Sequence, residues 1–483
     1  MADGLPAGLR AVGCDRGDRI SAAVPFGLRS HFMKTTLLGA ALLTLASLTA
    51  GHAQSLDKAK LDQFFDRLAE KNKAMGSLTI AKDGEMVYAR AIGYSSINGA
   101  DKIPLTAANR FRIGSITKMF TAAMAFQLIE EGKLKLTDTL DRFLPQIPNA
   151  GRITIEQILT HRSGIPNVRR ERDPSAAANA PAPSTLPMTN EEHLAMIVKA
   201  RPDFEPDTKT SYSNSGFVVM GLILEKLTGK PYAAALAERI TETLGLKDTY
   251  VATTNIDVKK NEALTYIHFG ANWQAVSETH PTILFSAGAI VSTPGDLAKF
   301  VSALFEGKVV SKETLDRMKT MREGEGFGMT TFTFAGKTFY GHTGGADNYG
   351  AWLAYEPEEK LAIAYTTNAK IYPVENIVRG VIEICFNRPF QIPALEGIAV
   401  RPEVLDQYVG AYSSSDAPAK AKITRDGATL YFQPPGASSA VALEATAEDK
   451  FQIEGVVTFT FDAAKGQVTV KRRQGERVFT KER

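Results

Sequence analysis

The apolar positions between residues 56 and 92 change their spacing once, from that of a helix to that of strands. Helical spacing from residue 56 to residue 73 predicts an amphipathic helix, whose apolar side holds Leu56, Leu61, Phe64, Phe65 and Leu68. Residues 77–81 and 86–92 are then strand-like on either side of the turn pair Asp83-Gly84. We therefore expect a helix followed by a β-hairpin.

The middle of the chain is helical, and strands return after it. A helical run from Ser115 to Glu131 opens this region, and helical patterns dominate to about residue 245. Strand patterns reappear at 331–334, 337–340, 351–355 and 361–366. Strands at both ends with helices between them predict an α+β fold, because a repeating βαβ unit would alternate the two throughout.

The last part of the chain has a different pattern. Residues 389–402 contain Pro389, Pro393 and Pro402 and are expected to form a linker. Residues 403–483 show short apolar runs separated by turn signals, which predicts roughly eight strands in a small antiparallel barrel or sandwich. This segment holds no histidine, no cysteine and no acidic cluster suited to chemistry. We expect no catalysis there.

Residues 169–190 stand apart in composition. A charged stretch from Arg169 to Pro174 leads into an Ala/Pro-rich segment that ends at Pro187. This composition is typical of a mobile surface loop. In an enzyme such a loop could cover a substrate, although an exposed insertion without a role explains the composition equally well.

Overall composition sets limits on the function. A length of 483 residues suggests two or three domains. Lys and Arg number 56 and Asp and Glu 53, so the chain has no basic field for nucleic acid. Of the cysteines Cys14 and Cys385, only Cys385 would remain after removal of a leader, which leaves neither an internal disulfide nor a thiolate metal site. No metal or cofactor is expected, because four further histidines lack ligand spacing and are taken as structural or exposed: His161, His193, His268 and His280.

The N-terminal region carries an export pattern. Met33-Lys34 precedes an apolar run from Thr36 to Ala50, and Gly51-His52-Ala53 follows as a small-x-small cleavage site. We interpret residues 33–53 as a secretory signal peptide, cleaved after Ala53. Residues 1–32 do not fit ahead of it, so translation is expected to start at Met33. The mature protein would be periplasmic or extracellular, or membrane-anchored if the signal is not cleaved.

Ser115-Ile116-Thr117-Lys118 carries the first candidate chemistry. A serine hydroxyl needs a neighbouring base before it can act as a nucleophile. Residues three apart on a helix share a face, with Cβ atoms about 5–6 Å apart, so Lys118 can reach the Ser115 hydroxyl. The start of a helix also offers N–H groups and a positive dipole end to an oxyanion. Taken alone, this pattern more often marks an unrelated serine and an exposed lysine.

Tyr212-Ser213-Asn214 is the second motif. Residues two apart in an extended segment point to the same side, so Tyr212 and Asn214 could face one cleft. A charged lysine beside Tyr212 would favour its phenolate and allow it to transfer a proton. Asn214 could hold that lysine and a substrate carbonyl. Taken alone, the motif is more typical of a turn.

His342-Thr343-Gly344-Gly345 is the third motif, between two strand-like runs. Two glycines at a strand edge let a substrate backbone approach closely. The Gly345 N–H could then donate to the same oxyanion as the Ser115 N–H. A single histidine near a glycine turn is more often structural.

The three motifs together resemble the penicillin-binding-protein and class C β-lactamase superfamily of serine hydrolases, which has SxxK, YxN and a third glycine-containing motif in this order. Four longer segments are also similar to that family: Phe111–Ser115, Ile158–Pro166, Phe204–Gly216 and Ala287–Leu297. The resemblance covers residues 56–388. The tail, which opens with Leu405–Tyr412, resembles the lipocalin-like barrel that some members carry.

The resemblance implies a domain organisation and a fold. Residues 54–388 would form a hydrolase domain with an antiparallel sheet flanked by helices and an all-helical region. A linker at 389–402 and a β-barrel domain at 403–483 would follow, with residues 1–32 as a doubtful extension and 33–53 as the signal peptide.

The resemblance also implies roles. Ser115 would attack a carbonyl and become an acyl-enzyme, Lys118 and Tyr212 would share acid and base work, and the first base of the two stays open. Four residues would position the substrate: Asn214, His342, Thr343 and Gly344. The N–H groups of Ser115 and Gly345 would form the oxyanion hole. The partner would be a small-molecule or peptide substrate, with cell-wall association left open.

Two departures from the family pattern bear on the substrate. The β-lactamases and carboxypeptidases usually have lysine where this chain has His342, and a histidine is mostly neutral at pH 7 unless perturbed. Strong β-lactam hydrolysis is therefore not expected, whereas a D-amino-acid peptide, a peptidoglycan-type peptide or an ester remains suitable. The Pro-Gly of the family is Pro206-Asp207 here, a change for which the sequence gives no consequence.

Other classes fit less well. An α/β-hydrolase would need Gly-x-Ser-x-Gly, and a metalloprotease His-Glu-x-x-His, and neither pattern is present. A binding protein or sensor that is acylated on Ser115 and deacylates slowly is the remaining alternative.

Overall fold

The computed structural model describes residues 56–482 except 169–182, 270–271, 396, 416, 436–439, 454–456 and 473–474. The predicted N-terminal extension, Cys14 and the signal peptide lie outside these residues. So does most of the loop predicted at 169–190.

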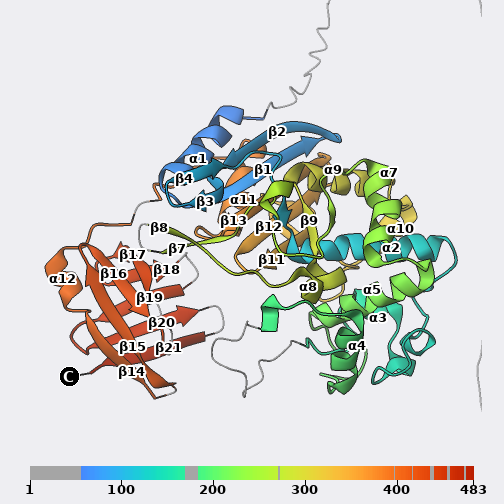
Figure 1. The fold of residues 1–483 in the computed structure, drawn as a ribbon. Helices are drawn as coiled ribbons and strands as arrows, with labels where there is room; N and C mark the ends of the chain where they lie inside the picture. The colour runs from blue at the N-terminus through green and yellow to red at the C-terminus, as the bar shows by residue number, and fades with distance from the viewer. Residues whose placement is uncertain are drawn as a thin grey trace, which may run out of the picture. The chain divides into compact units, whose positions relative to one another are not determined.

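The largest sheet joins strands from both ends of the hydrolase region (Figure 1). Its antiparallel strands follow the order β10-β11-β12-β13-β1-β2. Their bounds are β1 (Met75–Lys82), β2 (Glu85–Ile92), β10 (Thr330–Phe334), β11 (Lys337–Ala346), β12 (Tyr349–Glu356) and β13 (Leu361–Ala369). Ile80 of β1 lies opposite Ile363 of β13. The predicted hairpin is confirmed, since Asp83 and Gly84 have φ of 52° and 80°, as a tight two-residue turn requires.

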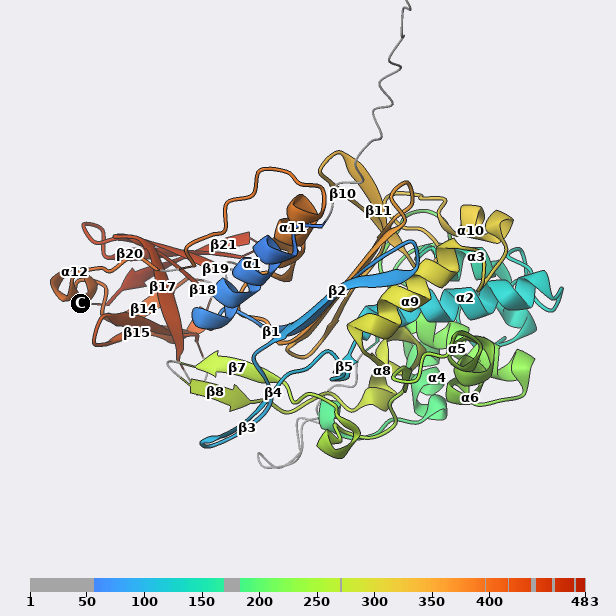
Figure 2. The ribbon, with the colours of Figure 1, turned by 90° about the horizontal axis from the view of Figure 1, so that it is seen from above.

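Helices pack on both faces of this sheet (Figure 2). α1 (Lys58–Glu70) and α11 (Val374–Cys385) bury their apolar sides in one cluster with Ile80 and Ile363. α2 (Thr117–Glu130) and α9 (Pro294–Phe305) share a second cluster with Leu353. Because successive residues of a strand point to opposite faces of the sheet, a single strand can supply side chains to both clusters. The predicted helix at 56–73 is confirmed, and Asp57 caps it by accepting from the Lys60 N–H at 2.9 Å.

The helical region between the two parts of the sheet holds further helices. They are α3 (Ile155–Leu159), α4 (Asn190–Lys199), α5 (Asn214–Thr228), α6 (Tyr232–Leu236), a π-helical segment (Ala237–Thr241), α7 (Glu242–Leu244), α8 (Pro281–Gly288) and α10 (Lys312–Met318). α8 is kinked at Phe285, where φ is 39° and ψ is −135°. α5 lies close against α8 at Gly221, where an added Cβ would lie 2.0 Å from the Ser286 hydroxyl.

Short strands complete this region in three small sheets. They pair β3 (Tyr94–Asn98) with β4 (Asp101–Pro104), β7 (Tyr266–Phe269) with β8 (Asn272–Ala275), and β5 (Phe111–Arg112) and β6 (Tyr250–Val251) with β9 (Ile290–Ser292). β5 leads directly into the segment that carries Ser115.

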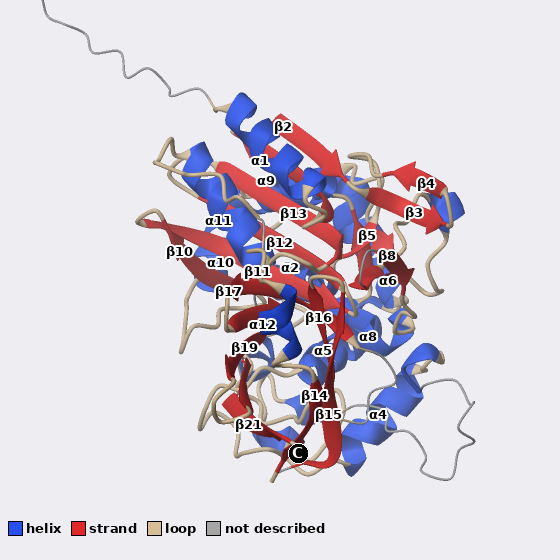
Figure 3. Cartoon of the chain, turned by 90° about the vertical axis from the view of Figure 1, so that its left-hand side faces the viewer, coloured by secondary structure: helices blue, strands red, loops and turns tan. Residues whose placement is uncertain are grey.

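The C-terminal strands close into a barrel after α12 (Pro402–Asp406), which decides between the barrel and the sandwich that the sequence left open (Figure 3). Its strands are β14 (Gly410–Ser414), β15 (Ala417–Asp426), β16 (Thr429–Gln433), β17 (Val441–Ala447), β18 (Lys450–Ile453), β19 (Val457–Asp462), β20 (Gln467–Arg472) and β21 (Gly475–Lys481). β14 pairs with β21, so that no edge of the sheet is left open. Inward-facing apolar side chains such as Ile423, Phe432 and Phe459 fill the interior.

Two kinds of feature are absent from the part of the chain that the structure describes. None of the helices in this part has both the length and the apolar character needed to cross a membrane. No group of three or more His, Cys, Asp or Glu side chains among the described residues is arranged to hold a metal ion.

Candidate active site

Ser115 lies where the backbone before α2 comes into close contact with the backbone of β11. It belongs to a 3₁₀ turn, Gly114–Ile116, that precedes α2, so it stands just before α2 and not within the helical run predicted from Ser115. Gly114 has φ of 51°, and an added Cβ would lie 2.6 Å from the Gly345 nitrogen of β11. A Cβ on Gly344 would lie 1.9 Å from the Ile113 carbonyl oxygen. Only glycine fits either position, and this contact brings the Ser115 and Gly345 backbones together.

Lys118 is fully buried beneath Ser115. Its Nζ lies 3.0 Å from Ser115 Oγ, 2.8 Å from Asn214 Oδ1 and 2.8 Å from the Ala287 carbonyl oxygen. Burial lowers the pKa of Lys118 well below its ordinary value, and the carboxyl of Glu325 opposes this only in part. The side chain is therefore a strong candidate for a neutral amine.

Tyr212 approaches Ser115 from the other side. Its hydroxyl donates to Ser115 Oγ at 2.7 Å. Burial raises the pKa of Tyr212, and the hydrogen bond with Ser115 offsets this in part. The raised pKa of Tyr212 runs against the expected phenolate, because burial of the phenol outweighs any effect of the neighbouring lysine. Tyr212 is a neutral phenol that donates.

Two residues that the sequence did not indicate hold the Tyr212–Asn214 segment. Asn167 Nδ2 donates to the Tyr212 carbonyl at 3.0 Å, and Asn167 Oδ1 accepts from the Asn214 N–H at 2.6 Å. The ring of His161 packs on Tyr212 with centroids 4.4 Å apart, and its Nδ1 accepts from the Ser213 N–H at 3.1 Å. His161 is buried, which confirms a structural position. His161 lies within the segment at 158–166 that resembles the family and Asn167 follows it directly, and that resemblance is the one signal that could have found them.

His342 lies on β11 beside Tyr212, with ring centroids 6.2 Å apart. Burial, together with Lys118, lowers the pKa of His342 to about 4. Its Nδ1 is within hydrogen-bonding distance of the Thr343 carbonyl, which fixes Nδ1 as the donor. The expected neutrality of His342 at pH 7 is confirmed. Thr343 is exposed on the same strand.

The contacts of Asp207 give a reason for its presence where the family has the glycine of a Pro-Gly pair. It has φ of 68°, a conformation that glycine adopts freely and aspartate tolerates. Its Oδ1 accepts from the buried Arg162 Nε at 2.7 Å, and its carbonyl accepts from Arg162 Nη2 at 2.6 Å. Arg162 also donates to Glu323 Oε2 at 2.9 Å. This network ties the chain before Tyr212 to the loop that carries Glu325.

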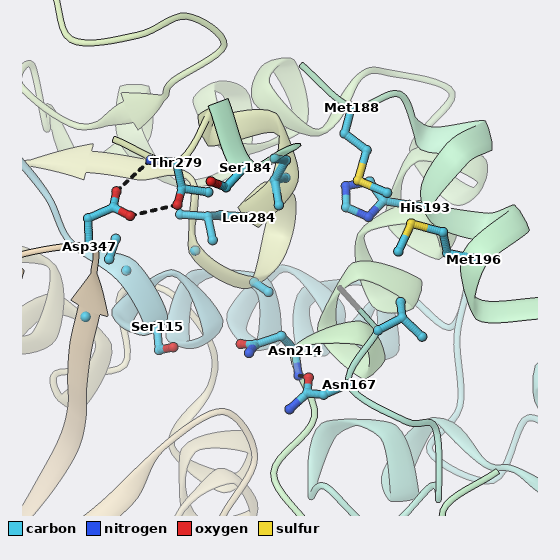
Figure 4. Close-up of a pocket in the computed structure, with 17 residues that line it drawn as sticks. Ser115, Asn167, Ser184, Met188, His193, Met196, Asn214, Thr279, Leu284 and Asp347 are labelled. Atoms are coloured by element: carbon cyan, nitrogen blue, oxygen red, sulfur yellow. Dashed lines mark hydrogen bonds between the residues drawn. The ribbon is translucent and has the colours of Figure 1, made fainter. Parts of the chain in front are cut away.

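A cavity of about 410 Å³ opens beside Ser115 (Figure 4). Its lining includes apolar side chains, namely Val168, Met188, Met196, Ile283 and Leu284. Polar side chains lie between them, among them Asn167, Ser184, His193, Asn214, Thr279 and Asp347. Neither Tyr212 nor His342 is among the lining residues described.

The motifs are thus brought together as the sequence predicted. Hydrogen bonds link Ser115, Lys118, Tyr212 and Asn214, and the glycine contacts place β11 against them. Such an arrangement can activate a hydroxyl and transfer protons next to a cavity suited to an acyl group.

Comparison with known proteins gives matches along the same region. The family model described as Beta-lactamase matches residues 61–380. Penicillin-binding protein 4* of Bacillus subtilis (strain 168) is 26% identical over 441 residues, covering 84% of this chain and 94% of its own. The D-alanyl-D-alanine-carboxypeptidase/endopeptidase AmpH of Escherichia coli (strain K12) is 26% identical over 399 residues, covering 75% of this chain and 100% of its own.

Solved structures agree. The D-amino acid amidase from Ochrobactrum anthropi SV3 complexed with D-phenylalanine has a TM-score of 0.60 and 25% identity, covering 68% of this chain and 99% of that one. The octameric penicillin-binding protein homologue from Pyrococcus abyssi has a TM-score of 0.59 and 26% identity, covering 88% of this chain and 100% of that one. Because the family match spans all three motifs on the matching fold, the chain belongs to the β-lactamase family of serine hydrolases, which includes the penicillin-binding proteins.

Proposed function

We propose that this protein is an exported hydrolase that cleaves an amide or ester through an acyl-enzyme on Ser115. The observation that carries the proposal is the position of Ser115 Oγ, held between Lys118 Nζ at 3.0 Å and the Tyr212 hydroxyl at 2.7 Å. A base and an acid thus meet at one nucleophile.

The contacts of Lys118 favour it as the first base. A neutral amine has two hydrogens and one lone pair. The Ala287 carbonyl and Asn214 Oδ1 can only accept, so they take the two hydrogens. The lone pair is left for the Ser115 hydroxyl proton. Since Tyr212 already donates to Ser115 Oγ, that oxygen is polarised from one side and deprotonated from the other.

The proposed reaction then runs in two halves. Ser115 Oγ forms a bond to the carbonyl carbon as its proton passes to Lys118, and the N–H groups of Ser115 and Gly345 stabilise the oxyanion. Tyr212 gives its proton to the leaving nitrogen or oxygen, which departs as an amine or alcohol, while Lys118 keeps the serine proton until Ser115 Oγ is released in the second half. Water attacks the acyl-enzyme in the second half, with the same groups exchanging protons in reverse.

The substrate class is proposed from chemistry and likeness together. AmpH is named a D-alanyl-D-alanine carboxypeptidase and endopeptidase, and the Ochrobactrum enzyme a D-amino acid amidase. D-amino-acid peptides, peptidoglycan-type peptides and esters therefore suit this chain. The neutral His342 offers no cation for the carboxylate of a β-lactam, so β-lactam hydrolysis would be weak.

Export and domain organisation are part of the proposal. Residues 33–53 have the pattern of a signal peptide. An enzyme that cleaves peptidoglycan-type peptides would then meet its substrate outside the cytoplasm. The hydrolase domain would occupy 54–388 and the barrel domain 403–483, joined by the linker at 389–402.

A substrate panel tests the proposal. We expect turnover of p-nitrophenyl esters and D-amino-acid amides, slow turnover of nitrocefin, and loss of all three in a Ser115→Ala variant. Intact-mass measurement should show one acyl group on the wild type and none on the variant. Stoichiometric labelling without turnover would favour a slowly deacylating sensor, and full turnover by Ser115→Ala would contradict the mechanism.

A further inference from the structure

Asp347 is the one Asp, Glu, Lys or Arg among the described residues that line the cavity beside Ser115. It is exposed at the turn after β11, two residues beyond Gly345, and has φ of 50°. Thr279 holds it in place, with the Thr279 N–H donating to Oδ2 at 2.8 Å and the Thr279 hydroxyl to Oδ1 at 2.7 Å (Figure 4). Each carboxylate oxygen keeps a second lone pair for a ligand.

The cavity takes the acyl part of a substrate and not the leaving group. The leaving group must meet the acid that protonates it, which is Tyr212 in the proposed reaction, and Tyr212 does not line the cavity. The acyl carbonyl must meet the Ser115 and Gly345 N–H groups, and both residues do line it. The apolar side chains of its lining and Asp347 therefore face the acyl group.

The charges around the cavity favour a cation. Burial lowers the pKa of both Lys118 and His342 beneath the cavity, which weakens the positive charge that would oppose a bound cation. His193 is set in the wall, its Nε2 2.9 Å from the Thr282 carbonyl oxygen. Lys370 donates to the Asp347 backbone carbonyl at 3.1 Å, and its Nζ would lie 3.5 Å from a Cβ on Gly345, so one cation stands close to this turn although it is not among the described residues that line the cavity. The carboxylate thus presents a negative charge beside an apolar surface.

We propose that Asp347 binds an ammonium group on the acyl part of the substrate, so that the protein prefers acyl donors with a free amine and an apolar portion. This inference rests on the proposed function. A charge-assisted hydrogen bond to a carboxylate discriminates an ammonium from an acetylated amine by about tenfold to a hundredfold. An acyl group ending in a carboxylate would be repelled from the same position.

Paired substrates test it. The substrates are D-alanyl and D-alanyl-D-alanyl p-nitroanilides, each with a free, an acetylated or a succinylated amine. They vary both the charge at the amino end and its distance from the scissile bond. The wild type should prefer the free amine at one of the two lengths by tenfold or more in kcat/KM. Asp347→Asn should remove that preference and leave the acetylated donors unchanged, because asparagine adopts positive φ and keeps bonds to Thr279.

Asp83→Asn is the matched control, since it removes an exposed aspartate from another turn of positive φ, outside the cavity. It should leave the preference intact. An equal fall for free and acetylated donors in Asp347→Asn would show a structural role and overturn the inference, as would a wild type without preference. In that last case acyl-enzyme formation would still support the proposed function, whereas its absence would overturn both.

Discussion

The guanidinium of Arg162 is buried, and Asp207 binds it twice, through its carboxylate at 2.7 Å and its backbone carbonyl at 2.6 Å. Asp207 makes this contact from a left-handed backbone conformation, with φ of 68°. Glycine would adopt that conformation more easily but would leave the Arg162 Nε without an acceptor.

We therefore predict that Asp207→Gly destabilises the protein, by about 1–3 kcal/mol in the free energy of unfolding, since an unsatisfied buried charged donor costs more than the backbone gains. Asp207→Asn, which keeps an acceptor and tolerates positive φ, should fall between the two. Arg322→Ala, which removes an exposed partner of the same carboxylate, should cost less than about 1 kcal/mol. Urea unfolding measures all three, and an Asp207→Gly variant as stable as the wild type would contradict the account.

The lowered pKa of Lys118 predicts a pH dependence of stability. Between that lowered value and the ordinary 10.5, the unfolded chain binds a proton that the folded chain does not. Stability should therefore rise with pH across this window, relative to a Lys118→Met variant, by up to about 1.4 kcal/mol per pH unit. Unfolding free energies of both proteins at a series of pH values check this.

A lysine at the surface provides the control for this measurement. Lys133→Met removes an exposed side chain that pairs with Glu131 at 2.7 Å. Its difference from the wild type should not change with pH over the same window. A flat difference for Lys118→Met as well would show that Lys118 is protonated in the folded state.

His342 should not titrate in the working range. Because its pKa is about 4, it stays neutral above about pH 5, and His342→Gln should leave the shape of the kcat/KM profile unchanged between about pH 5 and 8. The absolute rate can fall, since Gln lacks the ring that lies beside Tyr212. An inflection near pH 6.5 that is present in the wild type and lost in the variant would contradict this.

Asn167 should matter for rate more than for stability. Asn167→Ala frees the Tyr212 carbonyl and the Asn214 N–H, which lets the side chains of Tyr212 and Asn214 shift, and small displacements cost about a hundredfold in rate. Asn190→Ala is the control. Asn190 Nδ2 donates to Glu225 Oε2 at 2.8 Å, and neither residue belongs to the motifs. Steady-state kcat and the melting temperature separate the effects, and an unchanged kcat in Asn167→Ala would rule out the positioning role.

Local patterns predicted the parts that depend on nearby residues. The hairpin at Asp83-Gly84 and the helix before it follow from turn chemistry and spacing, and the short C-terminal strands follow from the turns between them, although their closure into a barrel does not. The Ser115 and Lys118 pair also follows from local spacing, although Ser115 stands in a 3₁₀ turn. These features need no information about distant contacts.

The remaining parts depend on contacts between distant residues. The raised pKa of Tyr212 follows from burial of its own phenol, which no pattern at either motif reveals. Asn167 has no special spacing, and its role exists only because α5 begins beside it. Asp207 is an unexplained replacement in the sequence, and it acquires a reason only when Arg162 lies next to it.

The kink in α8 at Phe285 has a consequence for engineering this protein. A non-glycine residue at φ of 39° and ψ of −135° costs about 1–3 kcal/mol, and the same turn of chain presents the Ala287 carbonyl to Lys118. Thermal selection without an activity screen would therefore favour changes that straighten α8 or replace Lys118. In heat-resistant variants obtained in that way, the loss of activity should increase with the gain in stability. A screen that retains turnover should instead select stabilising changes at positions remote from α8.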